Sequence, residues 1–445
     1  MSWSRWYAIK SYLLSTVWIA PVIALALEQL TFRIPHSLQF DFGVIPGFIF
    51  DKEGTVAVAN FAITESIAFL AFTFSSLLVA IQVASGQLTP RIIATMLLRD
   101  KPIRRSVAMF VYTLMLAAAV STRPDTIPRF LVSLVGLLGI VELIVFMFLI
   151  DYAARLLRPV SIVVRIAQQG LKVVEEVYPR LLKQMEAGTP ATLLDKLGPP
   201  ERTVFHRGTS AIVIALNLKA LAAAATRADC VIEFVPQVGD FVAAGEPLLL
   251  LRGPGAKSID ERKLRGWVAF GSERTIEQDS MFAFRVITDI GLKALSPAIN
   301  DPTTAVLAID QLQRLLRTVG QRVLQDEVIR DAEGRVRLIF RTPNWGDFVY
   351  LTFTELRQYG GQSVQVMRRL RAMIDSVMDA IPESRRAALR QELTLIDRAA
   401  EKAFVFPEDL ALARVPDSQG MGGTIFPEAA NGQRDLPGLA SVRSQ

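Results

Sequence analysis

The chain has 445 residues, of which 51% are hydrophobic and 21% are charged, and its mean hydropathy is +0.34. This composition is too apolar for an ordinary soluble enzyme of this length, so a membrane class is tested first. The net charge is +6, and no basic run is interleaved with aromatic residues. Anionic lipid is therefore favoured over nucleic acid as the partner of the basic side chains.

Four apolar windows occur in the first third of the chain. Each is close to the ~20 residues that cross a hydrocarbon layer of about 30 Å as a helix. A helix is expected because backbone groups in lipid must be paired within the protein. The region 1–152 is predicted to be a transmembrane domain with spans at residues 12–32, 62–84, 106–122 and 130–150.

The charges around these windows predict their orientation. The loop at residues 91–105 carries five basic residues and one acidic residue, so the positive-inside rule makes it cytoplasmic and a contact for anionic lipids. Both termini are then expected in the cytoplasm. The first window also resembles a signal peptide with small residues at Ala24 and Ala26, but an uncleaved helix is favoured.

Polar residues inside the spans are the first candidate site. Glu65 lies on the second span and Glu142 near the middle of the fourth. A charge at the bilayer centre costs roughly 2.5–3.5 kcal/mol on insertion scales, so such residues usually face a bundle or a water-filled path. Two interpretations of Glu65 and Glu142 therefore stay open. They have a role in permeation or proton transfer, or they are structural, either as neutral hydrogen-bonded acids or as residues at a helix end. The candidate intramembrane residues are Glu65, Thr73, Ser75, Ser76, Gln82 and Glu142.

The second span also carries small and polar residues at spacings of three and four, which indicate a helix-packing face or a pore lining. This stripe comprises Thr64, Ala68, Ala71, Ser75, Leu78, Gln82 and Ser85. Where it leaves the membrane, the chain supplies a candidate pore mouth: Gln87, Thr89, Pro90 and Arg91.

The rest of the chain is predicted to form a cytoplasmic α+β domain. Residues 153–200 have the pattern of a juxtamembrane helical region. Within the β-rich segment 201–272, the turns at Gly239 and Gly245 resemble the hairpin of biotinyl and lipoyl carrier domains, which implies a small barrel-sandwich-like module. The turns hold no lysine, so no cofactor is expected. Residues 273–415 are predicted to be helical, and residues 416–445 a disordered tail.

Catalytic chemistry has little support in the sequence. Cys230 is the only cysteine, and His36 and His206 are the only histidines, so a thiolate cluster, a histidine zinc site and a Ser–His–Asp triad are not expected. The sequence has no GxSxG elbow and no GxxxxGK loop. We therefore predict no enzyme activity and no metal site.

The second candidate site is a predicted apolar helix that carries four charged residues. Arg285 stands one turn before Asp289, which is the spacing of an ion pair within a helix. A buried charge that loses its partner costs on the order of 3–5 kcal/mol, so these residues must be paired if the helix is buried. Asp279, Arg285, Asp289 and Lys293 are therefore interpreted in one of two ways: as a structural ion-pair network, or as a binding site for an ion or polar ligand.

A corner follows this helix in the stretch "LKALSPAINDPTTAVLAIDQL", residues 292–312. Pro297 disfavours helical geometry at Ser296, while Asp301 is placed to cap a second helix that begins at Pro302. The pattern predicts a rigid corner. Helix-start amides attract anions, whereas carboxylates favour a cation or water, so a structural corner and a ligand site both stay open. The corner candidates are Ser296, Asn300, Asp301, Thr303 and Thr304.

The stretches "QDSMFAFRVITDIGLKALSPAINDPTTA" and "ASGQLTPR" resemble the motifs of a bacterial family of predicted membrane proteins of unknown function, whose signature is Ser-Pro-x-Ile-Asn-Asp-Pro-x-Thr-Ala. The likeness extends to about residue 405 and implies a bacterial cytoplasmic (inner) membrane location. We expect a multi-pass α-helical membrane protein with four transmembrane helices and a C-terminal cytoplasmic α+β domain. The preferred function is a homo-oligomeric channel or transport protein with a cytoplasmic gating domain. The alternative is a non-conducting membrane-anchored scaffold or ligand sensor.

Overall fold

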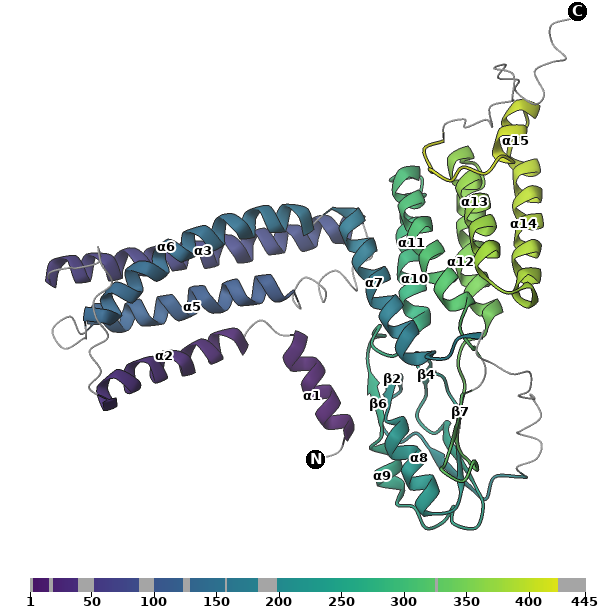
Figure 1. Cartoon of the computed structure of the whole chain (residues 1–445), viewed down its shortest axis with the longest axis horizontal. Coiled ribbons are helices and arrows are strands. Elements are labelled where there is room, and N and C mark those ends of the chain that lie inside the picture. Colours follow the sequence, from purple (N-terminus) through teal and green to yellow (C-terminus); the bar gives the residue numbers. More distant parts are fainter. Residues whose placement is uncertain are drawn as a thin grey trace, which may run out of the picture. The chain divides into compact units, whose positions relative to one another are not determined.

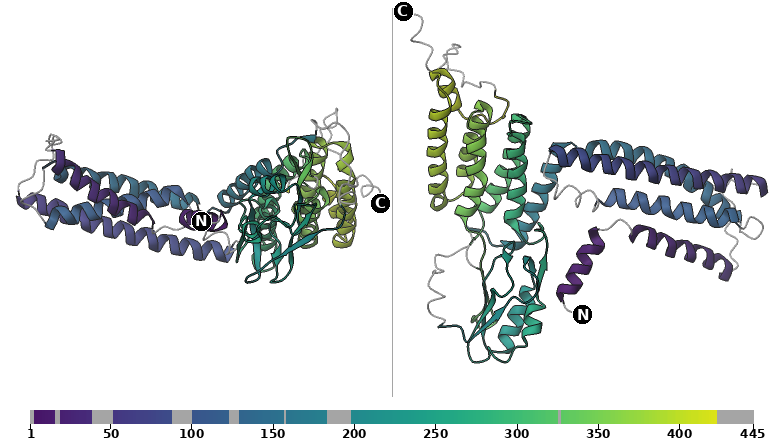
Figure 2. Two further views of the ribbon diagram at one scale, coloured as in Figure 1. Left: turned by 90° about the horizontal axis from the view of Figure 1, so that it is seen from below. Right: turned by 180° about the vertical axis from the view of Figure 1, so that it is seen from behind.

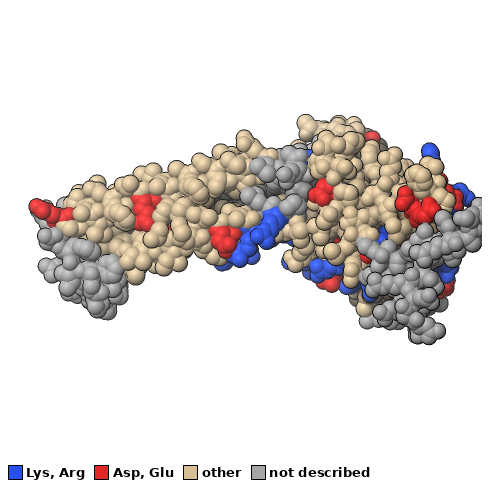
Figure 3. All heavy atoms as spheres, turned by 90° about the horizontal axis from the view of Figure 1, so that it is seen from above, with Lys and Arg blue, Asp and Glu red and all other residues tan. Residues whose placement is uncertain are grey.

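The computed structural model describes residues 3–15, 19–38, 52–87, 100–122, 129–156, 158–182, 198–324 and 327–422. It divides into two compact units, each considered by itself. The membrane unit is Ile9–Ser161, and the C-terminal unit is Met1–Ala8 together with Ile162–Gln445. On the face drawn in Figure 3, charged side chains are sparse along the helices of the membrane unit and more frequent over the C-terminal unit.

The membrane unit is helical, and in the part of it that the structure describes three helices are long and apolar enough to cross a bilayer. These are α3 (Lys52–Gln87), α5 (Lys101–Thr122) and α6 (Arg129–Leu156), which run side by side in Figures 1 and 2. They correspond to the second, third and fourth predicted spans. The third is longer than predicted because its helix begins at Lys101.

The predicted first span, residues 12–32, is not among these three. It falls on α1 (Trp3–Ser15) and α2 (Ile19–Leu38), separated by residues outside the described part of the chain. The apolar part of α2 is Pro21–Thr31, which is shorter than the stretch of apolar residues needed for a full span. The helix packs against α5, where the Thr31 and Tyr112 hydroxyl oxygens lie 2.9 Å apart.

The packing of α3, α5 and α6 is layered. In one layer Ala59 and Ala62 of α3 meet Leu116 and Ala117 of α5 and several apolar residues of α6, and small side chains let the helices approach closely. In another layer Phe69 of α3 stacks on Phe146 of α6 with ring centroids 4.1 Å apart. These two apolar layers lie above and below a third level of the bundle, which contains polar residues and is described in the next subsection.

The next helix, α7 (Pro159–Val177), buries one of its faces, and that face is apolar. Pro159 occupies its first position, where the missing N–H costs no hydrogen bond. The boundary between α6 and α7 therefore falls just before Pro159. Residues 183–197 of the predicted juxtamembrane region lie outside the described residues.

The β-module contains two sheets that share one apolar core. The five-stranded sheet has the order β1-β5-β3-β8-β7, and only its β3–β8 pair is parallel. The three-stranded sheet has the order β4-β2-β6. The elements are β1 (Arg202–Phe205), β2 (Ala211–Leu216), α8 (Leu218–Arg227), β3 (Val231–Phe234), β4 (Phe241–Val242), β5 (Pro247–Arg252), α9 (Glu261–Arg265), β6 (Val268–Gly271), β7 (Glu327–Arg330) and β8 (Val336–Phe340).

Two features of this module differ from the predicted arrangement. Strands β7 and β8 come from beyond residue 272, the predicted end of the module. The strands on either side of the Gly239 turn do not pair with each other, because β3 pairs with β5 while β4 pairs with β2 in the other sheet. The turn is thus a crossing between the two sheets.

The remaining elements form a helical layer, with α10 against α11 and α12, and α13 against α11 and α14. The first seven residues of the predicted tail, 416–422, are described and pack against α13. The rest of that tail lies outside the described residues. The helices are α10 (Ser280–Ala294), α11 (Pro302–Gly320), α12 (Trp345–Gly360), α13 (Val364–Ala380), α14 (Glu383–Ala403) and α15 (Pro407–Ala413).

Candidate functional site

The membrane unit contains a buried polar level between its two apolar layers. The Glu142 side chain of α6 is fully buried, and its Oε2 accepts a hydrogen bond of 2.7 Å from the Ser66 hydroxyl of α3. Thr113 of α5 lies close to the same carboxyl without making a hydrogen bond. Glu65 is the fourth member, and these four residues are called the polar layer below.

Glu65 reaches this level beside a glycine. A Cβ added to Gly139, which lies one turn before Glu142, would stand 3.4 Å from Glu65 Oε2. The Glu65 carboxyl of α3 therefore lies against the turn of α6 that precedes Glu142. Three oxygen atoms of the polar layer are buried without a hydrogen-bond partner: Glu65 Oε2, Thr113 Oγ1 and Glu142 Oε1. Buried polar atoms are normally satisfied, so this set requires an explanation.

The α3 helix has two different faces. The buried face carries Ala59, Ala62, Ser66, Thr73 and Leu77 at helical spacing. The residues of the predicted stripe that the structure describes are all exposed on the other face of the single chain: Thr64, Ala68, Ala71, Ser75, Leu78 and Gln82.

The predicted intramembrane residues therefore separate into two groups. Glu142 and Thr73 are buried, whereas Ser75 and Gln82 are exposed; Glu65 is half-buried. Ser76 is also half-buried, and its hydroxyl donates to the backbone oxygen of Thr73 at 3.0 Å. The sequence had placed these residues in one group, but the helical period divides them between two sides. At the predicted pore mouth, Thr89, Pro90, Arg91 and the side chain of Gln87 lie outside the described residues.

In the C-terminal unit, Arg285 and Asp289 of α10 form an ion pair. Arg285 donates to Asp289 at 2.7 Å and to Glu355 of α12 at 2.5 Å. The contact between Arg285 and Glu355 joins α10 to α12. An ion-pair network was one of the two alternatives for these residues, and a ligand site was the other.

The corner between α10 and α11 has the predicted capping. Asp301 Oδ1 accepts the backbone N–H of Thr304 at 3.0 Å, and Pro302 is the first residue of α11. Asn300 takes a positive φ of 49°, a conformation that asparagine tolerates better than most residues. The Asp301 amide donates to the Ala294 oxygen at 2.7 Å, which closes the turn. Thr303 follows in the first turn of α11, and Ser296 bonds back to Lys293 at 2.7 Å.

Asp279 lies at the other end of α10, about 22 Å along the helix from the corner. The candidate residues of this helix and of the corner therefore do not form one site. Its Oδ1 caps α10 through the Phe282 amide at 3.0 Å. Its Oδ2 is buried without a hydrogen-bond partner and lies 4.0 Å from Arg274 Nε. Burial raises the pKa of Asp279 to about 6, against the opposing effect of Arg274.

The Gly239 turn is held at this end of α10. Arg274 Nε donates to the Gly239 oxygen at 2.7 Å, and the neighbouring Gln278 accepts the Leu216 amide at 2.9 Å. A Cβ on Gly239 would stand 2.3 Å from Asp279 Oδ2. Gln278 and Asp279 thus join the β-module to the helical layer.

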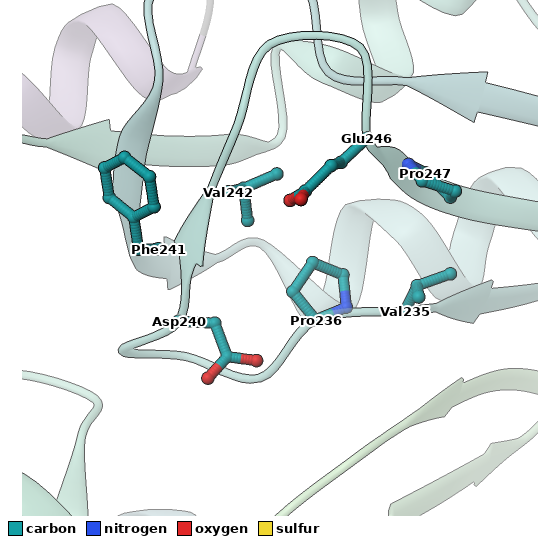
Figure 4. Close-up of a pocket in the computed structure, with 7 residues that line it drawn as sticks. All are labelled: Val235, Pro236, Asp240, Phe241, Val242, Glu246 and Pro247. Carbon is teal, nitrogen blue, oxygen red and sulfur yellow. The ribbon is translucent and has the colours of Figure 1, made fainter.

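A pocket of about 390 Å³ lies at the tips of the β-module turns, as Figure 4 shows. Its two carboxylates already accept backbone N–H groups, Asp240 from Gln237 at 2.8 Å and Glu246 from Ala243 at 2.9 Å. They therefore stabilise turns. The lining residues are Val235, Pro236, Asp240, Phe241, Val242, Glu246 and Pro247.

The sequence analysis missed the buried arginines of α13. Arg368 is 1% exposed and donates to the backbone oxygens of Val415 and Gly422, both at 3.0 Å. Asp417 accepts three backbone N–H groups within the same segment. The sequence signal for these buried arginines was the occurrence of three arginines within four residues, Arg368, Arg369 and Arg371, on an amphipathic helix. Within the described ranges, no group of three or more His, Cys, Asp or Glu side chains could hold a metal ion.

Comparison with known proteins places the chain among uncharacterised membrane proteins. The family model described as "Predicted membrane protein (DUF2254)" matches residues 10–376. The uncharacterized protein Rv1290c of Mycobacterium tuberculosis is 28% identical over 457 residues, which cover 95% of this chain and 84% of that protein. The uncharacterized protein Mb1321c of Mycobacterium bovis matches with the same identity and coverage. No solved structure matches.

Proposed function

Since the chain belongs to the DUF2254 family of predicted membrane proteins, we propose that it is a homo-oligomeric channel or transport protein whose path is lined by the exposed face of α3. The observation that carries the proposal is the division of α3 into two faces. Its buried face packs within one chain, while Thr64, Ser75 and Gln82 point away from that packing.

The exposed side of α3 carries large apolar residues that suit lipid, but the stripe that contains Thr64, Ser75 and Gln82 is less suited to it. Polar side chains in a spanning helix normally face a bundle or a water-filled cavity, because hydrocarbon offers them no hydrogen bonds. Small residues between them allow another helix to approach closely. A second copy of the chain meets both requirements, since copies around a symmetry axis would turn their α3 faces toward a shared path.

We further infer that α2 is a fourth span. The Ser4 amide donates to the Gly266 oxygen at 3.0 Å, and the Tyr7 hydroxyl bonds to Glu277, all within the C-terminal unit. Groups joined by hydrogen bonds lie on one side of a membrane, so the chain between residues 8 and 162 must cross it an even number of times. The three long helices among the described residues supply an odd number. With 20 residues, α2 is about 30 Å long, sufficient for the remaining crossing.

The proposed orientation follows from the basic loop. Lys101, Arg104 and Arg105 lie at the start of α5, in a region that the positive-inside rule makes cytoplasmic. Both termini and the C-terminal unit are then in the cytoplasm of a bacterium, under its inner membrane, with anionic lipid at this loop. We propose that the C-terminal unit regulates the path from the cytoplasmic side.

The test is ion flux through the purified full-length chain in liposomes. Ser75→Leu and Gln82→Leu are expected to change conductance or selectivity, because each removes a polar group from the path. Val79→Leu is the matched control, because it lengthens an exposed side chain of the same helix without removing a polar group. No flux from a folded oligomer across several salts, pH values and membrane tensions would contradict the proposal and favour the scaffold or ligand sensor.

A further inference from the structure

Ser66 of the polar layer lies on the buried face of α3, opposite the proposed path, and the path gives the layer no role. We propose that it binds one Na⁺ ion, in competition with a proton on Glu142. The site consists of the Glu142 carboxyl, the Ser66 and Thr113 hydroxyls and the Glu65 carboxyl, contributed by α3, α5 and α6.

The first argument is charge. The Glu65 carboxyl of α3 lies beside Gly139, one turn of α6 before Glu142, yet the basic residues of the three helices occur only near helix ends. Arg129 and Arg155 are each thirteen positions from Glu142, about 20 Å along the helix. Uncompensated carboxylates at this depth are costly, so a mobile cation or proton must neutralise them.

The second argument is the set of atoms. The three unpartnered atoms of the layer are all oxygen, and Glu142 and Thr113 are both fully buried. Carboxylate and hydroxyl oxygens are hard ligands, which suit cations such as Na⁺ rather than soft transition metals. Ca²⁺ takes six to eight oxygens and Mg²⁺ requires near-octahedral geometry. The few side-chain oxygens of this layer fit a monovalent ion better.

The third argument is enclosure. On one side the layer is bounded by Ala62 and Leu116, and on the other by Phe69, which contacts both Phe110 and Phe146. Such apolar boundaries exclude water, which strengthens the attraction between a bound cation and the carboxylates. Membrane transport proteins commonly place Na⁺ or proton sites near the bilayer midplane, and Glu142 is near the middle of α6.

The site can be tested without measuring transport, so its failure is distinguishable from failure of the proposed function. A hydrophobic carbodiimide modifies protonated carboxyl groups inside membranes, and peptide mapping locates the label. At constant ionic strength in K⁺, we expect Glu142 of the full-length chain in liposomes to be labelled faster at lower pH. Na⁺ at ten times its Kd leaves about one-eleventh of the sites free, so labelling should slow about tenfold.

Two variants separate a binding site from a buried structural acid. Ser66→Ala removes one proposed ligand but leaves Glu142 in place, so labelling should continue while protection by Na⁺ weakens. Glu53→Gln removes an exposed carboxyl from the start of the same helix and should leave the protection unchanged.

Equilibrium binding of radioactive Na⁺ is measured in parallel, with about one saturable site expected per chain and none in Glu142→Gln. The proposal is overturned if wild-type protein shows no saturable Na⁺ binding, whatever the labelling result. It is also overturned if Glu142 is labelled equally fast in Na⁺ and K⁺.

Discussion

The buried carboxyl of Asp279 makes the junction between the β-module and α10 sensitive to pH. The side chain is 5% exposed, and burial raises its pKa from 3.8 to about 6. Arg274 opposes this increase and Asp240 adds to it. A raised native pKa stabilises the folded state below the unfolded pKa, and this contribution is lost as the pH rises through about 6.

The magnitude follows from the difference between the two pKa values. About two pKa units at 1.4 kcal/mol each correspond to roughly 3 kcal/mol of stabilisation that disappears between pH ~4 and pH ~6. Asp279→Asn keeps an oxygen to accept the Phe282 amide but removes the ionisable group. We expect this variant to lose that pH dependence and to be more stable than wild type at neutral pH.

The assay is hydrogen exchange at the amides of the first turn of α10, in full-length protein in detergent, corrected for the intrinsic effect of pH on exchange. Protection in wild type should fall from pH 5 to pH 7, and in Asp279→Asn it should stay constant. Asp260→Asn is the matched control, because Asp260 caps the short helix α9 in the same way at an exposed position. The reasoning is refuted if wild-type protection rises over this range, or if the slope persists in Asp279→Asn.

The other predictions concern local stability, measured by thermal unfolding in detergent. Arg385→Ala should lower the free energy of unfolding by about 3 kcal/mol, because Arg385 donates to the carbonyl groups at the end of α11 and charged hydrogen bonds contribute ~1.5–3 kcal/mol each. Glu383→Ala, which removes an exposed ion pair, is the control. A smaller loss of stability in Arg385→Ala than in Glu383→Ala would contradict this prediction. Gly239→Ala should prevent normal folding, whereas Gly334→Ala, with a similar positive φ of 79° but open space, should cost far less. Asp301→Ala should cost about 1 kcal/mol by removing a helix cap, and equal stability of the two proteins would refute that role.

Features with a local physical cause could be predicted from the sequence. The corner at residues 296–304 depends on proline geometry and a capping carboxylate, both of which act over a few residues, and Asp301 caps α11 as predicted. The Arg285–Asp289 pair likewise follows from helical spacing alone.

Features that depend on tertiary contacts could not be predicted. The parallel pairing of β3 with β8 joins residues about a hundred positions apart, so the local pattern of residues 201–272 gave no indication of it. The division of α3 into a buried and an exposed face required knowing where α5 and α6 pack. The polar layer is an example, because Ser66 had no distinguishing sequence signal until Glu142 was placed beside it.

The central claim is that the exposed face of α3 lines an aqueous path. Cys230 is the only cysteine, so Cys230→Ser provides a background for single cysteines on this helix. A water-soluble, membrane-impermeant thiol reagent is applied to the protein in liposomes. We expect Ser75→Cys and Gln82→Cys to react rapidly, and Thr73→Cys on the buried face of the same helix to stay unmodified. Equal protection of all three positions in a folded protein would contradict the account.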